Sequence, residues 1–258
     1  MNTVKPKKNL GQHFLRDENI ARRIAESLTM HGNYKTLLEI GPGTGVLSKY
    51  LMDKPEFEYW GMDVDAESVQ YLHAHYPGFA ERILEVDFLK TPLEDYFGTE
   101  KFAIIGNFPY NISSQILFRM LEYRQQVTEV VGMFQKEVAQ RVVAGPGGKV
   151  NGILSILCQA FYDIEYLFQV DEHVFTPPPK VKSAVIRLKR NSVEQLPCNE
   201  KRFFQVVKMA YNQRRKTLRN ALKALQVNWN ELPAEISGKR AEQLSVADFV
   251  RITQQLEE

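Results

Sequence analysis

The stretch GNFPYNISS, residues 106–114, places an amide, a proline and a phenol directly after the apolar run KFAII. The side-chain oxygen of Asn107 and the backbone carbonyl of Pro109 are hydrogen-bond acceptors, and together they could hold both hydrogens of an amino group. Pro109 fixes its own φ and has no competing N–H, while Tyr110 offers a flat face for a ring. The pattern predicts chemistry on an exocyclic amine such as that of adenine. The alternative is a plain strand-to-helix turn.

A glycine-rich turn lies earlier in the chain, in LEIGPGTGVLS, residues 38–48. Gly41 and Gly43 belong to its G-x-G-x-G pattern, and glycines let a backbone approach a ligand closely. Asp63 ends the next apolar run, where an acid accepts both hydrogen bonds of a ribose diol. Asp87 ends a third run and precedes Phe88, so the pair could bind an adenine by accepting from its amino group and stacking on its ring. Without these acids the turn could equally be structural.

The identity of the bound nucleotide depends on the spacing of the glycines. The dinucleotide pattern G-x-G-x-x-G would need the third glycine one residue later. The form E-x-G-x-G, with Glu39 at the end of the run, resembles the loop of class I methyltransferases. S-adenosyl-L-methionine is therefore the expected cofactor, and NAD is the less favoured alternative.

Asn107–Phe108–Pro109–Tyr110 resembles the [N/D]-P-P-[Y/F] signature of methyltransferases that act on amino groups conjugated to a ring or an amide. Nearly the whole chain resembles the KsgA (RsmA) family of ribosomal small-subunit RNA adenine dimethyltransferases. The motifs that carry the resemblance, in the family's order, are KKNLGQHFL (7–15), LEIGPGTG (38–45), GNFPYNIS (106–113), FQKEVAQRVVAGPG (134–147), FTPPPKVKSAVIRL (175–188) and AYNQRRKTLRN (210–220).

The resemblance implies N6,N6-dimethylation of two adjacent adenosines in the 3′-terminal hairpin loop of small-subunit rRNA, with a role in ribosome biogenesis. It departs from the family pattern at His13, where Asn is usual, at Phe108, where Leu is usual, and at Asp63, where Glu is more common. The resemblance and the residue chemistry together imply Asn107, Pro109 and Tyr110 as catalytic residues. The implied cofactor-binding residues are Gln12, His13, Leu15, Gly41, Gly43, Asp63, Asp87, Phe88 and Asn107.

Charge is strongly segregated along a chain whose net charge is only +2. Residues 1–23 have net charge +4, residues 50–100 have −9 and residues 180–223 have +11. Two basic segments around an acidic middle predict a surface for a polyanion such as RNA, although single charged runs are often only solvated faces. Lys5 and Arg16 belong to the first basic segment. The expected RNA-binding residues are Lys7, Lys8, Arg214, Arg215, Lys216 and Arg219.

The fold class predicted from the alternating patterns is α/β: a Rossmann-like methyltransferase domain over residues 1–192 and a small all-helical RNA-binding domain over 193–258. Apolar strand-like runs at 37–40, 58–63, 82–87, 101–107 and 129–135 alternate with helical patterns, including 46–54. Two later runs, 163–170 and 183–190, are expected to form an antiparallel edge. Beyond about residue 195 only helical spacing is found, with Ser245 and Asp248 spaced as a capping box.

Two other functions fit parts of the pattern. One is the related dimethylation of a large-subunit rRNA adenine that confers macrolide resistance, and the other is a non-catalytic nucleic-acid-binding or assembly factor. The two cysteines show no metal-ligand spacing, so no metal site is expected. The N-terminal residues lack the apolar core of a signal peptide. We expect a cytoplasmic monomer whose partner is the immature small ribosomal subunit.

Overall fold

The computed structural model describes residues 4–256 of the chain. The chain forms two compact units, one of Met1–Ala139 with Ile164–Arg190 and one of Gln140–Asp163 with Asn191–Glu258. The C-terminal segment of the second unit begins at Asn191, close to the predicted boundary at 192/193, but the unit also includes Gln140–Asp163, which was predicted to lie in the first domain. The outermost residues of the two predicted domains, 1–3 and 257–258, lie outside the described part.

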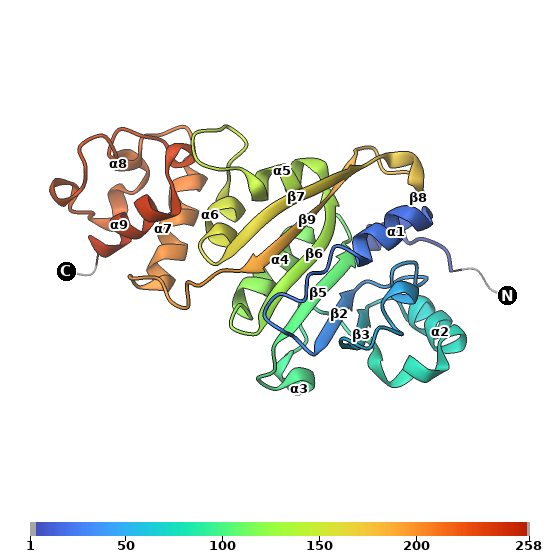
Figure 1. The fold of residues 1–258 in the computed structure, drawn as a ribbon. Helices are drawn as coiled ribbons and strands as arrows, with labels where there is room; N and C mark the ends of the chain where they lie inside the picture. Colours follow the sequence, from blue (N-terminus) through green and yellow to red (C-terminus); the bar gives the residue numbers. More distant parts are fainter. Residues whose placement is uncertain (1–3, 257–258) are drawn as a thin grey trace. The chain divides into compact units, whose positions relative to one another are not determined.

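The first unit is built on a seven-stranded sheet with the strand order β4-β3-β2-β5-β6-β9-β7 (Figure 1). Five strands from β4 to β6 are parallel, and β9 runs antiparallel to β6. The prediction is confirmed for β9, which is antiparallel to β6, and β7 lies beside β9 at the edge of the sheet. The strands are β2 (Thr36–Ile40), β3 (Glu58–Asp63), β4 (Ile83–Glu85), β5 (Phe102–Asn107), β6 (Val127–Gln135), β7 (Tyr162–Val170) and β9 (Ser183–Arg190); a separate ribbon pairs β1 (Phe14–Leu15) with β8 (Phe175–Thr176).

Helices cover both faces of this sheet because its central strands are apolar on both sides. Ile24 of α1 and Leu72 of α2 belong to a buried cluster that includes Leu37 and Tyr59 of the sheet. Figure 1 shows α4 on the opposite side of the sheet from α1, as right-handed crossovers require where the strand order reverses at β2 and β5. The helices of this unit are α1 (Glu18–Ala25), α2 (Ala66–His75), α3 (Glu94–Phe97) and α4 (Ser113–Glu122).

The helix predicted over 46–54 is mostly absent. Only Ser48–Tyr50 is helical there, as a 3₁₀ turn, because the backbone closes i→i+3 hydrogen bonds such as Leu51 N–H to Ser48 carbonyl. The Ser48 hydroxyl meanwhile donates to the buried Glu39 carboxylate at 2.7 Å. This tertiary bond holds the segment against the glycine turn.

The second unit is helical, as predicted for its C-terminal part. The capping box at the start of α9 is confirmed: the Ser245 hydroxyl accepts the Asp248 N–H, and the Asp248 carboxylate accepts the Ser245 N–H. None of the helices within residues 4–256 is long and apolar enough to cross a membrane. The helices here are α6 (Ile153–Gln159), α7 (Glu200–Asn212), α8 (Leu218–Ala221) and α9 (Val246–Gln254), while α5 (Lys136–Val143) spans the division between the units.

Candidate active site

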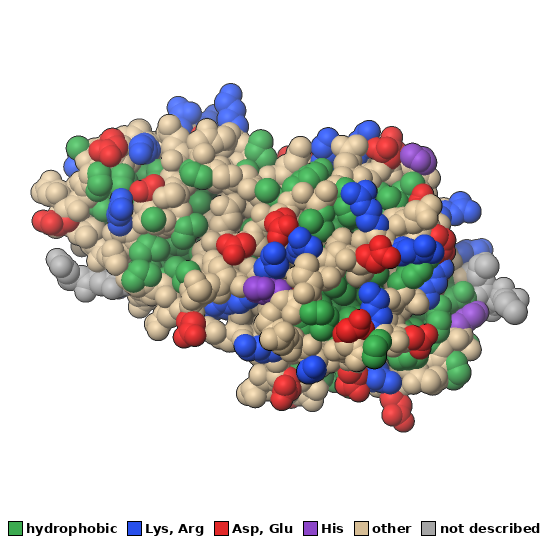
Figure 2. Space-filling model, in the orientation of Figure 1, with side chains coloured by type: hydrophobic (Ala, Val, Ile, Leu, Met, Phe, Trp, Pro, Cys, Tyr) green, Lys and Arg blue, Asp and Glu red, His purple; other side chains and the backbone are tan. Residues whose placement is uncertain are grey.

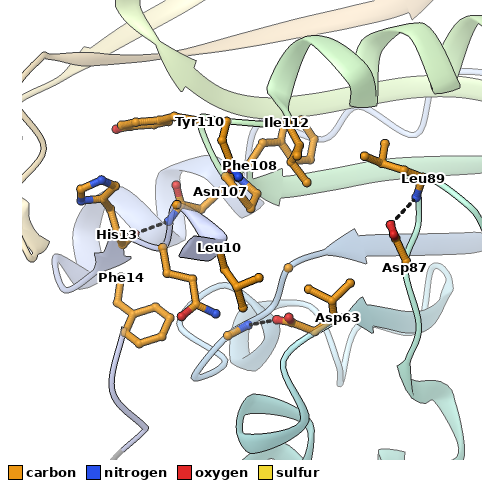
Figure 3. Close-up of a pocket in the computed structure, with 17 residues that line it drawn as sticks. Leu10, His13, Phe14, Asp63, Asp87, Leu89, Asn107, Phe108, Tyr110 and Ile112 are labelled. Carbon is orange, nitrogen blue, oxygen red and sulfur yellow. Dashed lines mark hydrogen bonds between the residues drawn. The ribbon is translucent and has the colours of Figure 1, made fainter. Parts of the chain in front are cut away.

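One pocket of about 210 Å³ gathers most of the residues that the sequence singles out. It lies at the carboxyl ends of β2, β3 and β5, where ligands bind in sheets of this type. Figure 3 shows His13 and Tyr110 at one end of the pocket, and Asp87 with Leu89 at the other. Its wall also contains Gln12, Gly41, Gly43, Asp63, Asn107 and Pro109.

Asp63 and the glycine turn form one hydrogen-bonded unit. The Asp63 carboxylate accepts the N–H of Gly43 at 3.1 Å and the N–H of Asp65 at 2.9 Å. Asp63 is 7% exposed, and this burial raises the pKa of its carboxyl above the ordinary value. Its unused lone pairs face a pocket that Gly41 also lines, and Gly41 adopts the left-handed φ of +67°. The Asp63 carboxylate therefore offers acceptors to a ligand, and the glycine turn beside it has no side chain that would block the approach.

Asp87 lines the pocket as predicted, but Phe88 does not. One Asp87 oxygen accepts the Leu89 N–H at 3.0 Å, and the other pairs with Lys90 at 3.1 Å. Phe88 is 4% exposed and lies in the core, so the prediction that it stacks on an adenine is wrong. The turn at Asp87 directs Phe88 inward and brings Leu89 to the pocket instead.

The side-chain amide of Asn107 is held by one end only. Its Nδ2 donates to the backbone carbonyl of His13 at 2.9 Å, whereas its Oδ1 has no hydrogen-bond partner within residues 4–256. The Pro109 carbonyl accepts the Ile112 N–H at 3.2 Å, which leaves one of its two lone pairs. Asn107 lines the pocket, so the free amide oxygen is available to a donor on a ligand.

Phe108 lies beneath this acceptor, 1% exposed. A Cβ at Gly132 would come within 2.2 Å of its ring, and a Cβ at Gly106 within 2.7 Å. The ring also packs edge-on against Phe134 at 5.1 Å between centroids. The two glycines therefore make the room that the larger aromatic side chain needs.

Tyr110 and His13 form a stacked pair, with ring centroids 5.3 Å apart and planes 27° apart. The Tyr110 hydroxyl hydrogen-bonds to the Ser183 hydroxyl. His13 Nδ1 lies 2.7 Å from the Pro177 carbonyl oxygen, and Nδ1 must be the donor because a carbonyl only accepts. His13 thus lines the pocket, as predicted, and also ties the N-terminal segment to the proline-rich loop.

Residues 7–13, here called the strap, run along the pocket, and two of their side chains bind Asp65. The Lys7 ammonium and the Gln12 side-chain amide donate to the two Asp65 oxygens at 2.6 Å and 3.0 Å. Lys7 also pairs with Glu67 at 3.2 Å, and the Gln12 side-chain oxygen accepts the Lys7 N–H at 2.7 Å. Lys7 is therefore held by carboxylates rather than free for a phosphate, and Gln12 primarily positions the strap.

Leu15 lines a small cavity beside the main pocket rather than the main pocket itself, and it shares that cavity with Gly41, Gly43 and Asn107. It is 3% exposed and belongs to the core cluster, while its neighbour Phe14 lines the pocket. Successive side chains of a strand point to opposite sides, and Phe14–Leu15 is the strand β1. The role of Leu15 toward the cofactor therefore stays a prediction.

Glu39 lies under the glycine turn and is almost completely buried. Its Oε2 accepts the hydroxyls of Ser48 and Tyr59, both at 2.7 Å. Burial, opposed in part by these two hydrogen bonds, raises the pKa of this carboxyl to about 7. Glu39 is therefore extensively protonated in the folded protein below neutral pH.

This raised pKa makes Glu39 a source of pH-dependent stability. The folded state binds the proton more tightly than the unfolded state, so stability is lost as pH rises from the ordinary pKa through about 7. Between pH 5 and pH 8 we expect wild type to lose roughly 2.5 kcal/mol of unfolding free energy that Glu39→Gln does not lose. Urea unfolding across this range measures the difference, and parallel curves for the two proteins would contradict it.

The basic residues expected to bind RNA differ in whether their side chains already have partners within the protein. In the second unit, Arg214 donates to the Lys149 carbonyl and lies 3.8 Å from Glu242. Arg215, Lys216 and Arg219 are exposed and have no ion pair within the described residues. Lys8, in the first unit, is likewise exposed and unpaired within residues 4–256. Figure 2 shows basic and acidic side chains interleaved on the face it draws. Lys7 is a cation that already has acidic partners, Asp65 and Glu67.

Several pocket residues were not predicted from the sequence. Val64 follows the ribose-type acid and is 50% exposed, and Leu89 stands two residues after Asp87. Their position directly beyond a strand-end acid is a signal that could have identified them. The remaining unpredicted wall residues are Leu10, Gly11, Phe14, Asn111 and Ile112.

Comparisons with known proteins identify the family of the chain. The family model described as Ribosomal RNA adenine dimethylase matches residues 3–258. The chain is 58% identical over 256 residues to the ribosomal RNA small subunit methyltransferase A of Cytophaga hutchinsonii, covering 99% of each chain. A dimethyladenosine transferase from Plasmodium falciparum shares the fold at TM-score 0.77 and 24% identity, covering 93% of this chain and 96% of that one. The 23S rRNA methyltransferase ErmE does so at 0.72 and 24%, covering 95% and 100%. The chain belongs to the ribosomal RNA adenine dimethylase family.

Proposed function

We propose that this protein dimethylates N6 of two adjacent adenosines in the 3′-terminal hairpin loop of small-subunit rRNA, using S-adenosyl-L-methionine. The observation that carries the proposal is the free Oδ1 of Asn107, an acceptor directed to a pocket whose other polar wall residues suit a nucleoside cofactor. The family membership and the 58% identity to a small subunit methyltransferase support the same conclusion.

The pocket residues fit the cofactor by their chemistry. A Cβ at Gly41 would meet nothing closer than the Pro109 ring at 3.8 Å, so it would project into the open pocket. Asp63 and Asp87 both line the pocket, and we assign Asp63 to accept from a ribose diol and Asp87 from an adenine amino group. Leu89 and Val64 provide apolar surface for the ring. When bound, S-adenosyl-L-methionine supplies a methyl group on a sulfonium, which is already a good leaving group.

Asn107 and Pro109 act on the acceptor amine. The N6 lone pair of adenine is delocalised into the ring, so the amine is a poor nucleophile while it remains planar. Two acceptors that hold its hydrogens favour a pyramidal nitrogen and direct the lone pair, and this positioning is the main catalytic contribution that we assign to the protein. The Nδ2–His13 hydrogen bond orients the amide so that Oδ1, not Nδ2, meets the amine.

The second transfer needs only one of these acceptors. After the first methylation, the amine retains a single hydrogen, which either Asn107 Oδ1 or the Pro109 carbonyl can accept. Tyr110 offers a ring face to the adenine in both rounds. An unstacked adenine is easier to present from a hairpin loop than from a duplex, which agrees with the proposed target.

RNA affinity is assigned mainly to exposed, unpaired cations. Arg215, Lys216 and Arg219 of the C-terminal segment and Lys8 of the strap are the residues we propose for phosphate contacts. Lys7 and Arg214, which were also predicted, have protein partners and are expected to contribute less. We propose that the protein works as a cytoplasmic monomer on the immature small subunit, where this RNA is accessible.

The decisive experiment uses small subunits that lack the modification. Incubation with methyl-labelled S-adenosyl-L-methionine, followed by mapping of labelled nucleotides, should find N6,N6-dimethyladenosine at two adjacent positions of the 3′-terminal hairpin. Large subunits are tested in parallel, because the fold is shared with ErmE and does not separate the two substrates. Label in 23S rRNA alone would favour the large-subunit alternative, and no transfer to either subunit would favour a binding factor.

A further inference from the structure

A second cavity, of about 450 Å³, adjoins the pocket just described. The two share a wall made of Gly11, Gln12, His13 and Tyr110. The far side of the second cavity is the proline-rich loop from Pro177 to Val181. The stacked His13–Tyr110 pair therefore lies between the two spaces, and both spaces belong to the first unit.

The two cavities differ in charge. The first is lined by the carboxylates of Asp63 and Asp87 and by no lysine or arginine. The second is lined by Lys8 and Lys180 and by no carboxylate. A ligand that spans the shared wall would thus meet acceptors on one side and cations on the other, which matches a cationic cofactor facing an anionic substrate.

The two lysines of the second cavity lack protein partners. Both are exposed, and neither forms an ion pair or side-chain hydrogen bond within the described residues. Lys182, two residues beyond Lys180, contrasts with them: its ammonium lies 2.9 Å from Asp171, and it does not line the cavity. Two unneutralised ammonium groups at the rim of one cavity suit an anion such as a phosphodiester.

The remaining walls suit a sugar. Pro177, Pro178 and Pro179 present rigid apolar surface, and Gln135 adds an amide that can bond to hydroxyls. The Pro177 carbonyl is bonded to His13, which holds the loop against the strap. The cavity is therefore bounded by two segments that bind each other directly.

We propose that this second cavity holds the ribose and the flanking phosphates of the target nucleotide, with Lys8 and Lys180 on the phosphates, while the base passes Tyr110 to reach Asn107. The inference rests on the proposed function, which it deepens by assigning the recognition of the substrate's anionic backbone to a specific site. The prolines contact the sugar. Because the two lysines bind phosphates, the cavity should bind a nucleotide more tightly than a free nucleoside.

The test compares adenosine 3′,5′-bisphosphate with adenosine, each titrated into the full-length protein saturated with S-adenosyl-L-homocysteine. We expect wild type to bind the bisphosphate roughly tenfold more tightly or better, because each phosphate gains a charge-assisted contact. The double variant Lys8→Ala/Lys180→Ala should bind the two ligands about equally. Lys182→Ala is the matched control and should keep the preference.

Several results would overturn the proposal: equal binding of the two ligands by wild type, no binding of either, a preference that survives in the double variant, or an equal loss in Lys182→Ala. S-adenosyl-L-homocysteine affinity of the double variant, expected to be unchanged, confirms that the fold and the cofactor pocket are intact. Failure here is distinguishable from failure of the proposed function, because wild-type labelling of small-subunit rRNA measures that function without reference to the lysines.

Discussion

Asn107→Ala is expected to lower the rate of methyl transfer by roughly a hundredfold to a thousandfold, comparable to the loss of one preorganised transition-state contact in other enzymes. The variant removes the free Oδ1, the acceptor that we propose for one hydrogen of the target amine. Single-turnover transfer to undermethylated small subunits measures the chemical step directly. A rate close to wild type would remove Asn107 from the mechanism.

Two measurements separate this effect from a structural one. Asn107 is also a predicted cofactor contact, and its Nδ2 bond holds the strap, so affinity for S-adenosyl-L-homocysteine is measured as well. We expect that affinity to fall by no more than about tenfold, as the loss of one hydrogen bond allows, and so by much less than the rate. Asn107→Asp keeps an acceptor but places an oxygen against the His13 carbonyl. We expect its rate to lie between those of wild type and Asn107→Ala.

Asp63→Ala is expected to weaken cofactor affinity by at least about a hundredfold, since it removes the two charge-assisted acceptors that we propose for the ribose diol. It also releases the N–H groups of Gly43 and Asp65, which the carboxylate now holds at 3.1 Å and 2.9 Å. Calorimetric titration with S-adenosyl-L-homocysteine measures the effect without any need for activity. An unchanged dissociation constant would show that Asp63 does not bind the cofactor.

The matched control for this variant is Asp95→Ala, an exposed aspartate on α3 outside the pocket, which should leave affinity unchanged. Thermal unfolding of both variants separates loss of binding from loss of fold. The pKa of Asp63 adds a pH dependence: burial raises it, and only the ionised form accepts both hydroxyls. Wild-type affinity should therefore decline on acidification at a higher pH than for an ordinary aspartate.

The strand-end residues could be identified from the sequence because each belongs to a short continuous motif. The glycine turn, Asp63, Asp87 and Asn107 all follow apolar runs, and parallel strands bring the ends of such runs to one edge of a sheet. The strand pattern and the capping box at Ser245 were predictable for the same reason, since local spacing determines them.

Side-chain direction within those motifs depended on tertiary structure. Phe88 stands next to a residue that lines the pocket, yet it points into the core, whereas the equally buried Leu15 lines a small adjoining cavity. Membership of a motif does not decide between the two sides of a strand or turn. That choice follows from pairing and packing with distant elements, such as the pairing of β1 with β8.

Partnerships between distant residues were decided only by the fold. Lys7 and Asp65 are 58 positions apart, and His13 and Pro177 are 164 positions apart, so no local pattern links them. In the folded chain Lys7, a predicted phosphate contact, instead pairs with Asp65 and holds the strap in place. The fold also brings Lys8 and Lys180 to one cavity. The sequence by itself determined which chemical groups stand at the strand ends. Tertiary structure decided which of them remain free, because a charged group or an amide is available to a ligand only where the folded chain leaves it unpaired.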